Sequence, residues 1–215
     1  MQKNEVMEKI AKKVRDCKKC RLYKEAQNAV PGEGSLDPEI VFIGEAPGAQ
    51  EDKTGRPFVG RAGRLLESLL EEIGMKREDV WIGNIIKHRP PGNRDPKPDE
   101  IGACEPYLTV QLRILQPKLI VTLGRFAMYY FYKGGKISRD HGNLIRVENS
   151  KVDKDLFVFP VYHPAAGLRN GRFREALEED FRRIPQILKQ IELDQVKIKT
   201  STSVEESKGQ IKLDL

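Results

Sequence analysis

Short, continuous apolar runs alternate along the chain with segments whose apolar residues recur every three or four positions. Four runs predict buried strands, at residues 40–43, 80–86, 119–123 and 156–161. Helical spacing is found at residues 6–14, 65–73, 99–115, 126–128 and 173–187. Strands that are apolar throughout are typical of parallel sheets covered on both faces. We therefore predict an α/β protein, a three-layer α/β/α sandwich with a central, mostly parallel four-stranded sheet.

The helical pattern is lost near the C-terminus. Residues 193–215 are rich in Ser, Thr and Lys and predict a flexible tail. The full chain of 215 residues is within the range of one domain, so we expect a single domain over residues 1–192. No run approaches 18 apolar residues, and the charged N-terminus lacks the apolar core of a signal peptide. We expect a soluble, cytoplasmic monomer that has no membrane partner.

Charge adds a preference for certain partners. Lys and Arg number 38 against 32 Asp and Glu, which gives a formal net charge of +6. This excess favours a polyanionic partner such as nucleic acid, although a well-solvated surface explains it equally well. High Lys and Glu content with only three cysteines is also typical of proteins from thermophiles.

A long polar, Gly-rich loop follows the first predicted strand, over residues 44–60. Its glycines do not have the spacing of a phosphate-binding loop, and acidic Glu45, Glu51 and Asp52 would repel a phosphate. A solvated connector is one interpretation of such a loop. Because ligands bind at the carboxyl ends of parallel strands, and because long loops there are usually functional, we favour a binding site.

Two other strand ends carry polar side chains that could recognise a ring. Asn84 lies in an otherwise apolar strand, where an amide needs a partner, either in the core or on a ligand. Its donor and acceptor complement the imide edge of a pyrimidine, and His163 could donate to a carbonyl oxygen of the same ring. Local structural roles remain the alternative for His163, as does core packing for Phe58.

The three cysteines do not suggest a disulfide framework, because their number is odd and two of them form the pair Cys17-x-x-Cys20. With Cys104 and His88 they supply four soft ligands. Such a set suits tetrahedral zinc or an iron–sulfur cluster. His88 could also be a basic residue of a surface turn.

Taken in order, these motifs carry a resemblance to a known family. They are Cys17-x-x-Cys20, Gly44-Glu45-Ala46-Pro47-Gly48, Gly55-Arg56-Pro57-Phe58-Val59-Gly60, Asn84 before Lys87-His88-Arg89-Pro90-Pro91, Cys104, and His163-Pro164-Ala165-Ala166. The series, which spans residues 14 to 190, resembles the family 4 uracil-DNA glycosylases. This resemblance implies an enzyme of base excision repair that flips uracil out of DNA and hydrolyses its N-glycosidic bond. The products would be an abasic site and free uracil.

The resemblance also implies roles for individual residues. Phe58 would stack on the flipped uracil, Asn84 would pair with its N3 and O4 edge, and His163 would donate to O2. Glu45, with the backbone of Ala46, would place or activate the water, or stabilise the cationic sugar. Glu51 would lie close to C5 and refuse the methyl group of thymine. Leu168 would fill the hole left by the flipped base. Phosphate contacts would come from Arg169, Arg56, Arg89, Lys87 and Arg94.

By the same resemblance, Cys17, Cys20, His88 and Cys104 would hold a [4Fe-4S] cluster that braces the N-terminal segment. The family pattern has a cysteine where this chain has His88, so a [3Fe-4S] cluster and zinc stay open as alternatives. In the tail, residues Gln210-Ile211-Lys212-Leu213 form a short apolar motif that could contact a sliding clamp.

Overall fold

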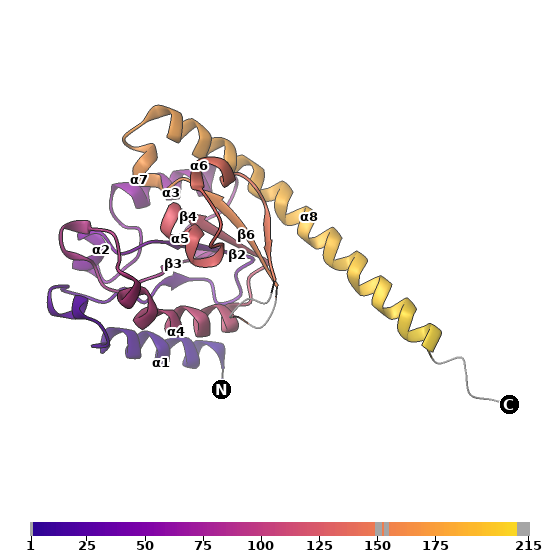
Figure 1. Cartoon of the computed structure of the whole chain (residues 1–215), viewed down its shortest axis with the longest axis horizontal. Coiled ribbons are helices and arrows are strands. Elements are labelled where there is room, and N and C mark those ends of the chain that lie inside the picture. Colours follow the sequence, from indigo (N-terminus) through magenta and orange to yellow (C-terminus); the bar gives the residue numbers. More distant parts are fainter. Residues whose placement is uncertain (1, 149–151, 153–154, 210–215) are drawn as a thin grey trace.

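The computed structural model describes residues 2–148, 152 and 155–209, with side chains as far as residue 194. Its centre is a six-stranded sheet in the order β1-β3-β2-β4-β6-β5 (Figure 1). The strands are β1 Glu33–Gly34, β2 Ile40–Gly44, β3 Trp81–Asn84, β4 Leu119–Leu123, β5 Ile145–Val147 and β6 Leu156–Val161. The four inner strands are parallel, and the two edge strands β1 and β5 are antiparallel to their neighbours.

Helices connect the strands. The α-helices are α1 Lys3–Arg15, α2 Ala49–Thr54, α3 Arg61–Glu72, α4 Pro98–Leu115, α5 Arg125–Phe131, α6 Ile137–Asp140, α7 Pro164–Gly167 and α8 Gly171–Gly209. Three 3-10 turns are η1 Arg21–Lys24, η2 Arg77–Asp79 and η3 Pro91–Asn93. All five predicted helical segments are confirmed. The short helix α2 lies inside the stretch that we had expected to be entirely loop.

Each face of the sheet supports its own apolar core, as the continuous apolar strands predict. One core joins alternate strand residues such as Phe42 and Val121 to α3 and α8. The other joins the opposite residues, such as Val41 and Ile120, to α1 and α4. Because side chains of a strand point alternately to the two faces, every second residue serves each core. Helices therefore cover both faces of the sheet.

The α/β class is confirmed, and the strand number needs correction from four to six. The four predicted strands are the parallel centre of the sheet. The two missed strands are short edges, β1 of two residues and β5 of three, and none of their residues is buried. A strand that buries no side chain leaves no apolar run in the sequence, so pattern analysis does not detect it.

The last helix, α8, continues as far as Gly209 and extends well away from the sheet (Figure 1). Most of the segment predicted as a flexible tail from residue 193 is thus drawn as helix. The motif at residues 210–213 lies outside the described residues. In the described part of the chain, no helix is both long and apolar enough to cross a bilayer.

Candidate active site

A cavity of about 340 Å³ opens at the carboxyl ends of the parallel strands. Its wall contains eight of the residues predicted from the sequence: Glu45, Ala46, Glu51, Phe58, Asn84, Arg94, His163 and Arg169. They come from the loop after β2, from α2, from the segment before α3, from the end of β3, from the segment between η3 and α4, and from the residues on either side of α7. Residues more than 120 positions apart in the chain therefore share one pocket, at the sheet edge that the sequence predicted.

The floor of the cavity depends on the pairing of two strands. Gly44 and Asn84 are direct neighbours in the parallel register of β2 and β3. A Cβ on Gly44 would lie 2.5 Å from Asn84 Oδ1 and 2.6 Å from the Phe58 ring, so a larger residue would displace both side chains. Glycine at this position lets the amide and the ring approach each other.

Asn84 is 1% exposed, and its Oδ1 has no hydrogen-bond partner among the described residues. An unpaired buried carbonyl oxygen is costly, which makes this atom a candidate acceptor for a ligand N–H. The backbone of Asn84 is held by the ammonium of Lys87, whose Nζ donates to three oxygens: Asn84 O at 3.1 Å, Pro31 O at 3.2 Å and Gln111 Oε1 at 2.9 Å. The phosphate contact expected of Lys87 is therefore wrong, because the side chain is buried.

The backbone of Phe58 is strained. Its φ of 50° is in the left-handed region, which a non-glycine residue adopts only when its surroundings enforce it. Two charged side chains do so. Glu51 Oε1 accepts the N–H groups of Val59 and Gly60, each at 2.9 Å. On the other side, the Arg77 guanidinium donates to the carbonyl of Phe58 at 3.1 Å and to that of Pro57.

Gly63 completes this support from the first turn of α3. A Cβ on Gly63 would lie only 1.8 Å from the carbonyl oxygen of Phe58. The helix therefore packs against the strained residue without a side chain between them. The ring of Phe58 is 7% exposed and its centroid lies 5.7 Å from that of the His163 ring.

His163 directly precedes α7, and its hydrogen bonding determines which ring nitrogen carries the proton. Its Nδ1 accepts the backbone N–H of Ala165 at 3.1 Å. Burial, with the charge of Arg169, lowers the pKa of His163 to about 4. The imidazole is therefore neutral near pH 7, with its proton on Nε2. His163 can thus donate one hydrogen bond from Nε2 without carrying a charge.

The pKa of Glu45 is shifted in the opposite direction, upward. Burial raises the pKa of Glu45 to about 7, and the charge of Asp95 adds to this effect while Arg125 opposes it. Asp95 lines the same cavity and pairs with Arg125, Nη2 to Oδ2, at 2.6 Å. A carboxyl group with a pKa near neutrality is suited to exchanging a proton with water.

Of the residues expected to contact DNA, Arg169 and Arg94 line the cavity, and the others lie outside its wall. Leu168 is 37% exposed, next to Arg169 in the cavity wall. Arg56 is exposed and forms an ion pair with Glu33 at 2.9 Å. Arg89 is half-buried, and its Nε donates to Asn93 Oδ1 at 2.8 Å. Arg94 also lines the cavity, but its guanidinium is engaged in a two-point ion pair with the buried carboxylate of Glu100.

The candidate metal ligands are Cys17 and Cys20 after α1, His88 after β3 and Cys104 within α4, and their chemistry fits a thiolate-bound group. All three cysteines are free thiols. Burial raises the pKa of Cys104 to about 11, and the nearby Cys20 and Cys17 contribute to that shift, so the thiols are close enough to interact. Cys104 Sγ accepts the backbone N–H of Lys87 at 3.4 Å. Burial lowers the pKa of His88, which leaves the neutral imidazole that binds metals.

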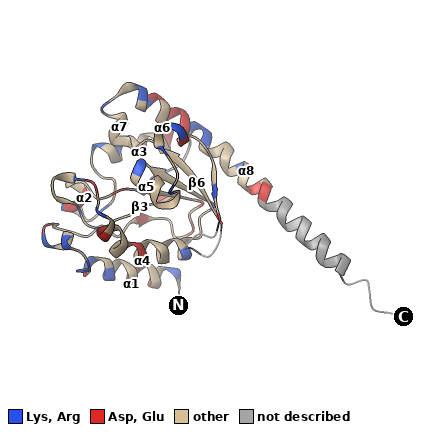
Figure 2. Ribbon diagram, in the orientation of Figure 1, with Lys and Arg blue, Asp and Glu red and all other residues tan. Residues whose placement is uncertain are grey.

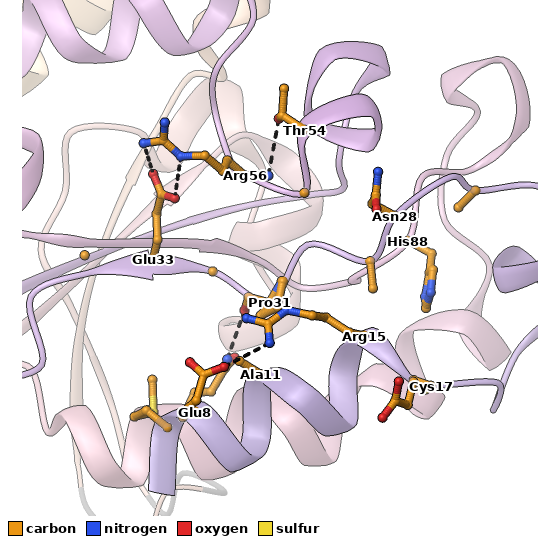
Figure 3. A pocket seen from close by; sticks show the side chains of 18 of the residues that line it. Glu8, Ala11, Arg15, Cys17, Asn28, Pro31, Glu33, Thr54, Arg56 and His88 are labelled. Atoms are coloured by element: carbon orange, nitrogen blue, oxygen red, sulfur yellow. Dashed lines mark hydrogen bonds and ion pairs between the residues drawn. The ribbon is translucent and has the colours of Figure 1, made fainter. Parts of the chain in front are cut away.

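Among the described residues, no three His, Cys, Asp or Glu side chains are arranged to hold a metal ion. Cys17 and His88 do line a common cavity of about 1040 Å³ between α1 and the loops that precede and follow β1 (Figure 3). Figure 3 shows these two side chains near one end of the cavity, while the ion pairs of Arg15 with Glu8 and of Arg56 with Glu33 lie in the other parts of its wall.

Three participants were missed by sequence analysis: Arg77, Asp95 and Arg125. Arg77 lies in η2, 19 residues after the backbone that it holds. Arg125 directly follows the glycine at the end of β4, a strand-end signal that pointed to this edge of the sheet. No sequence signal distinguishes Arg77 from the many exposed arginines, because its role depends on a tertiary contact.

The fold and the cavity define a class of protein that family comparison identifies. The model of the uracil DNA glycosylase superfamily matches residues 31–188. Within this superfamily the chain belongs to the type-4 uracil-DNA glycosylases. It is 49% identical to the type-4 uracil-DNA glycosylase of Sulfurisphaera tokodaii, with 84% of each chain covered.

Other relatives support the same family. The type-4 uracil-DNA glycosylase of Saccharolobus solfataricus is 50% identical, with 86% of this chain and 88% of the relative covered. That of Thermotoga maritima is 44% identical, with 87% of this chain and 97% of the relative covered. The resemblance recognised from the sequence motifs is thus confirmed.

Proposed function

We propose that the cavity at the carboxyl ends of β2, β3 and β6 holds the uracil that this glycosylase removes from DNA. The unpartnered Oδ1 of buried Asn84 carries this proposal. Uracil N3–H is a donor of the kind that this oxygen lacks, and the amide group of Asn84 can donate to O4. Cytosine has no proton at N3, so it would leave the Asn84 oxygen unpaired in the cavity.

The ring of Phe58 supplies the stacking surface. Stacking of a base on an aromatic side chain contributes about 1 to 3 kcal/mol. Glu51, which also lines the cavity, holds the backbone that carries this ring, and we assign it the rejection of thymine through contact with C5. Both roles require that the base leave the DNA stack first.

Cleavage of the glycosidic bond places negative charge on the departing uracil and positive charge on the sugar. His163 Nε2–H, donating to O2, stabilises the developing anion, and a preorganised donor of this kind is typically worth about 10² to 10³ in rate. Because the imidazole is neutral, it donates without transferring a full proton to the base. Glu45, in its carboxylate form, orients the attacking water together with the backbone of Ala46 and accepts its proton.

Around the cavity, Leu168 fills the space that the flipped base leaves, and Arg169 neutralises a neighbouring phosphate. Arg56 and Arg89 provide further contacts to the phosphates of the DNA backbone, and Arg94 provides another from the cavity wall. The wedge role is supported by the position of Leu168, an exposed apolar side chain directly next to Arg169 in the cavity wall. Arg56 and Arg89 are paired only with groups at the surface, so they can turn to a phosphate.

We further propose that Cys17, Cys20, His88 and Cys104 hold a [4Fe-4S] cluster, with a [3Fe-4S] cluster or zinc as the alternatives. When bound, such a cluster supplies structural bracing of the N-terminal segment, because hydrolysis requires no electron transfer. Support comes from three free, interacting thiols, from neutral His88, and from the N–H that donates to Cys104 Sγ.

The remaining proposals concern the whole chain. We propose a monomer with a single domain over residues 1–192 and a C-terminal extension, whose residues Gln210–Leu213 are a possible clamp-binding motif. Three free cysteines favour a reducing compartment, so we propose a cytoplasmic enzyme.

A strand-scission assay tests the central proposal. The protein is incubated with a uracil-containing oligonucleotide and then with alkali, which breaks the strand at abasic sites. We expect cleavage at uracil, at full rate in EDTA, and none at thymine. Asn84→Asp should reduce uracil excision strongly, because the carboxylate offers no donor to O4. The absence of alkali-labile sites with freshly purified protein would instead indicate a DNA-binding protein that keeps the fold without the reaction.

A further inference from the structure

Two large apolar side chains are exposed within six residues of each other beside the cavity. Leu168 is 37% and Phe173 is 38% exposed, and both lie at the connection between α7 and α8. The described chain has three other exposed large hydrophobic residues, which are Val110, Tyr129 and Leu193. Leu168 has an assigned role as the wedge, whereas Phe173 has none.

Phe173 is held by an aromatic stack rather than left free. Its ring stacks on that of Tyr162, with centroids 4.7 Å apart and an interplanar angle of 29°. Tyr162 in turn contacts the ring of His141 at 4.5 Å. His141 Nδ1 is hydrogen-bonded to Oδ2 of buried Asp180 at 2.8 Å. The exposed ring is therefore the outer end of a row of three rings that is fixed to the protein at its inner end.

The row is continuous with the active site. Tyr162 immediately precedes His163 at the end of β6. The turn that carries Leu168 also packs on the first turn of α8, since a Cβ on Gly167 would lie 3.4 Å from the Cα of Arg174. Phe173, the neighbour of Arg174, is thus presented on the same side of the fold as the proposed wedge.

The charge around this ring suits DNA. All residues from 168 to 175 are exposed, and this stretch contains three arginines, Arg169, Arg172 and Arg174, against one acidic residue, Glu175. Figure 2 shows basic residues gathered where α7 meets the start of α8. Arg174 pairs with Glu178 at 2.9 Å, while Arg169 lines the cavity. An exposed aromatic ring among arginines is the combination by which proteins bind unstacked bases.

We propose that Phe173 is a stacking platform for a nucleobase of the uracil-bearing strand, next to the nucleotide that is flipped. The flipped uracil leaves one face of each neighbouring base uncovered. Leu168, in the vacated space, would contact one of these faces, and Phe173 would cover the other. The supporting rings of Tyr162 and His141 preorganise the platform, so little conformational entropy is lost on binding. This inference rests on the proposed function of the cavity.

Replacement of the ring tests the platform directly. We would measure the dissociation constant for a DNA strand that contains a stable abasic-site analogue, at several salt concentrations. Phe173→Ala should weaken binding by about 5- to 150-fold, the range expected for loss of one stacked base. The slope of log Kd against log salt should not change, because stacking releases no counterions. Phe173→Tyr should bind like the unaltered protein.

Two controls separate stacking from other effects. Tyr129→Ala removes an even more exposed aromatic side chain from α5, and it should leave binding unchanged. Phe173→Leu keeps an apolar side chain but removes the ring, so binding as weak as that of Phe173→Ala supports stacking. Wild-type affinity in either Phe173→Leu or Phe173→Ala would overturn the platform.

A fluorescent base locates the contact. With 2-aminopurine beside the abasic analogue, the unaltered protein should quench the fluorescence and Phe173→Ala should not, whereas equal quenching by both would overturn the proposal. Excision of uracil by excess enzyme is measured in parallel. If the cavity proposal failed, the unaltered protein would not excise uracil. If only the platform failed, excision would be normal and the variants would bind alike.

Discussion

The perturbed carboxyl group of Glu45 gives a quantitative prediction for the pH dependence of excision. Burial raises the pKa of Glu45 from its ordinary value of 4.5 to about 7. If the carboxylate is the active form, activity appears as the pH rises through that value. The ionised fraction falls from about one half at pH 7 to about 1% at pH 5, so the rate should fall about 50-fold. A carboxyl group with an unshifted pKa would lose less than twofold over the same range.

Single-turnover kinetics with excess enzyme, from pH 5 to pH 9, measure this step without interference from product release. Binding of the same oligonucleotide is measured at each pH, so that a loss of affinity is not mistaken for a loss of rate. His163 does not contribute to the acid limb in this range, because its pKa of about 4 keeps it neutral. A rate that is flat between pH 5 and pH 7 would refute the assignment of Glu45 as the group that must ionise.

The ion pair between Asp95 and Arg125, next to Glu45, allows the acid limb of the pH–rate profile to be shifted in both directions. Asp95→Asn removes the negative charge that raises the pKa of Glu45, so the limb should shift to lower pH. Arg125→Gln removes the opposing cation and leaves Asp95 unpaired, so the limb should shift to higher pH. Both partners are about 60% exposed, and added salt should therefore reduce both shifts. Shifts of the same sign in the two variants would contradict the electrostatic explanation.

Three further variants address the donor, the strained loop and the cluster. His163→Ala should slow single-turnover excision by about 10² to 10³ while DNA affinity stays nearly constant; an equal loss in both would assign His163 to binding. Arg77→Ala should weaken uracil selectivity and lower the melting temperature, because the strained stacking residue loses its carbonyl anchors, whereas Arg182→Ala, which removes an exposed ion pair, should do neither. Cys104→Ala should abolish bound iron and sulfide in anaerobically purified protein, and His88→Cys should retain them. One zinc ion per chain and no sulfide in the unaltered protein would show that the site holds zinc and not an iron–sulfur cluster.

The sequence determined the parallel centre of the sheet and most of the residues that line the candidate cavity. Apolar runs such as 119–123 form strands that are buried on both faces of the sheet. Such runs can be recognised as strands from the sequence alone, without knowing which strands they pair with. Asn84 and His163 were recognisable because polar side chains at the ends of buried strands need a reason to be there. The edge strands escaped detection because Glu33–Gly34 and Ile145–Val147 bury none of their residues.

Only the tertiary structure decided how these residues are held and charged. Lys87 is a basic residue among basic residues in the sequence, yet it is buried and anchors Asn84, because three oxygens from separate segments surround its ammonium. The raised pKa of Glu45 and the left-handed backbone of Phe58 likewise come from groups far away in the chain. Residue types and their order are local properties that a sequence records, whereas burial and electrostatic fields are sums over neighbours that exist only after the chain has folded.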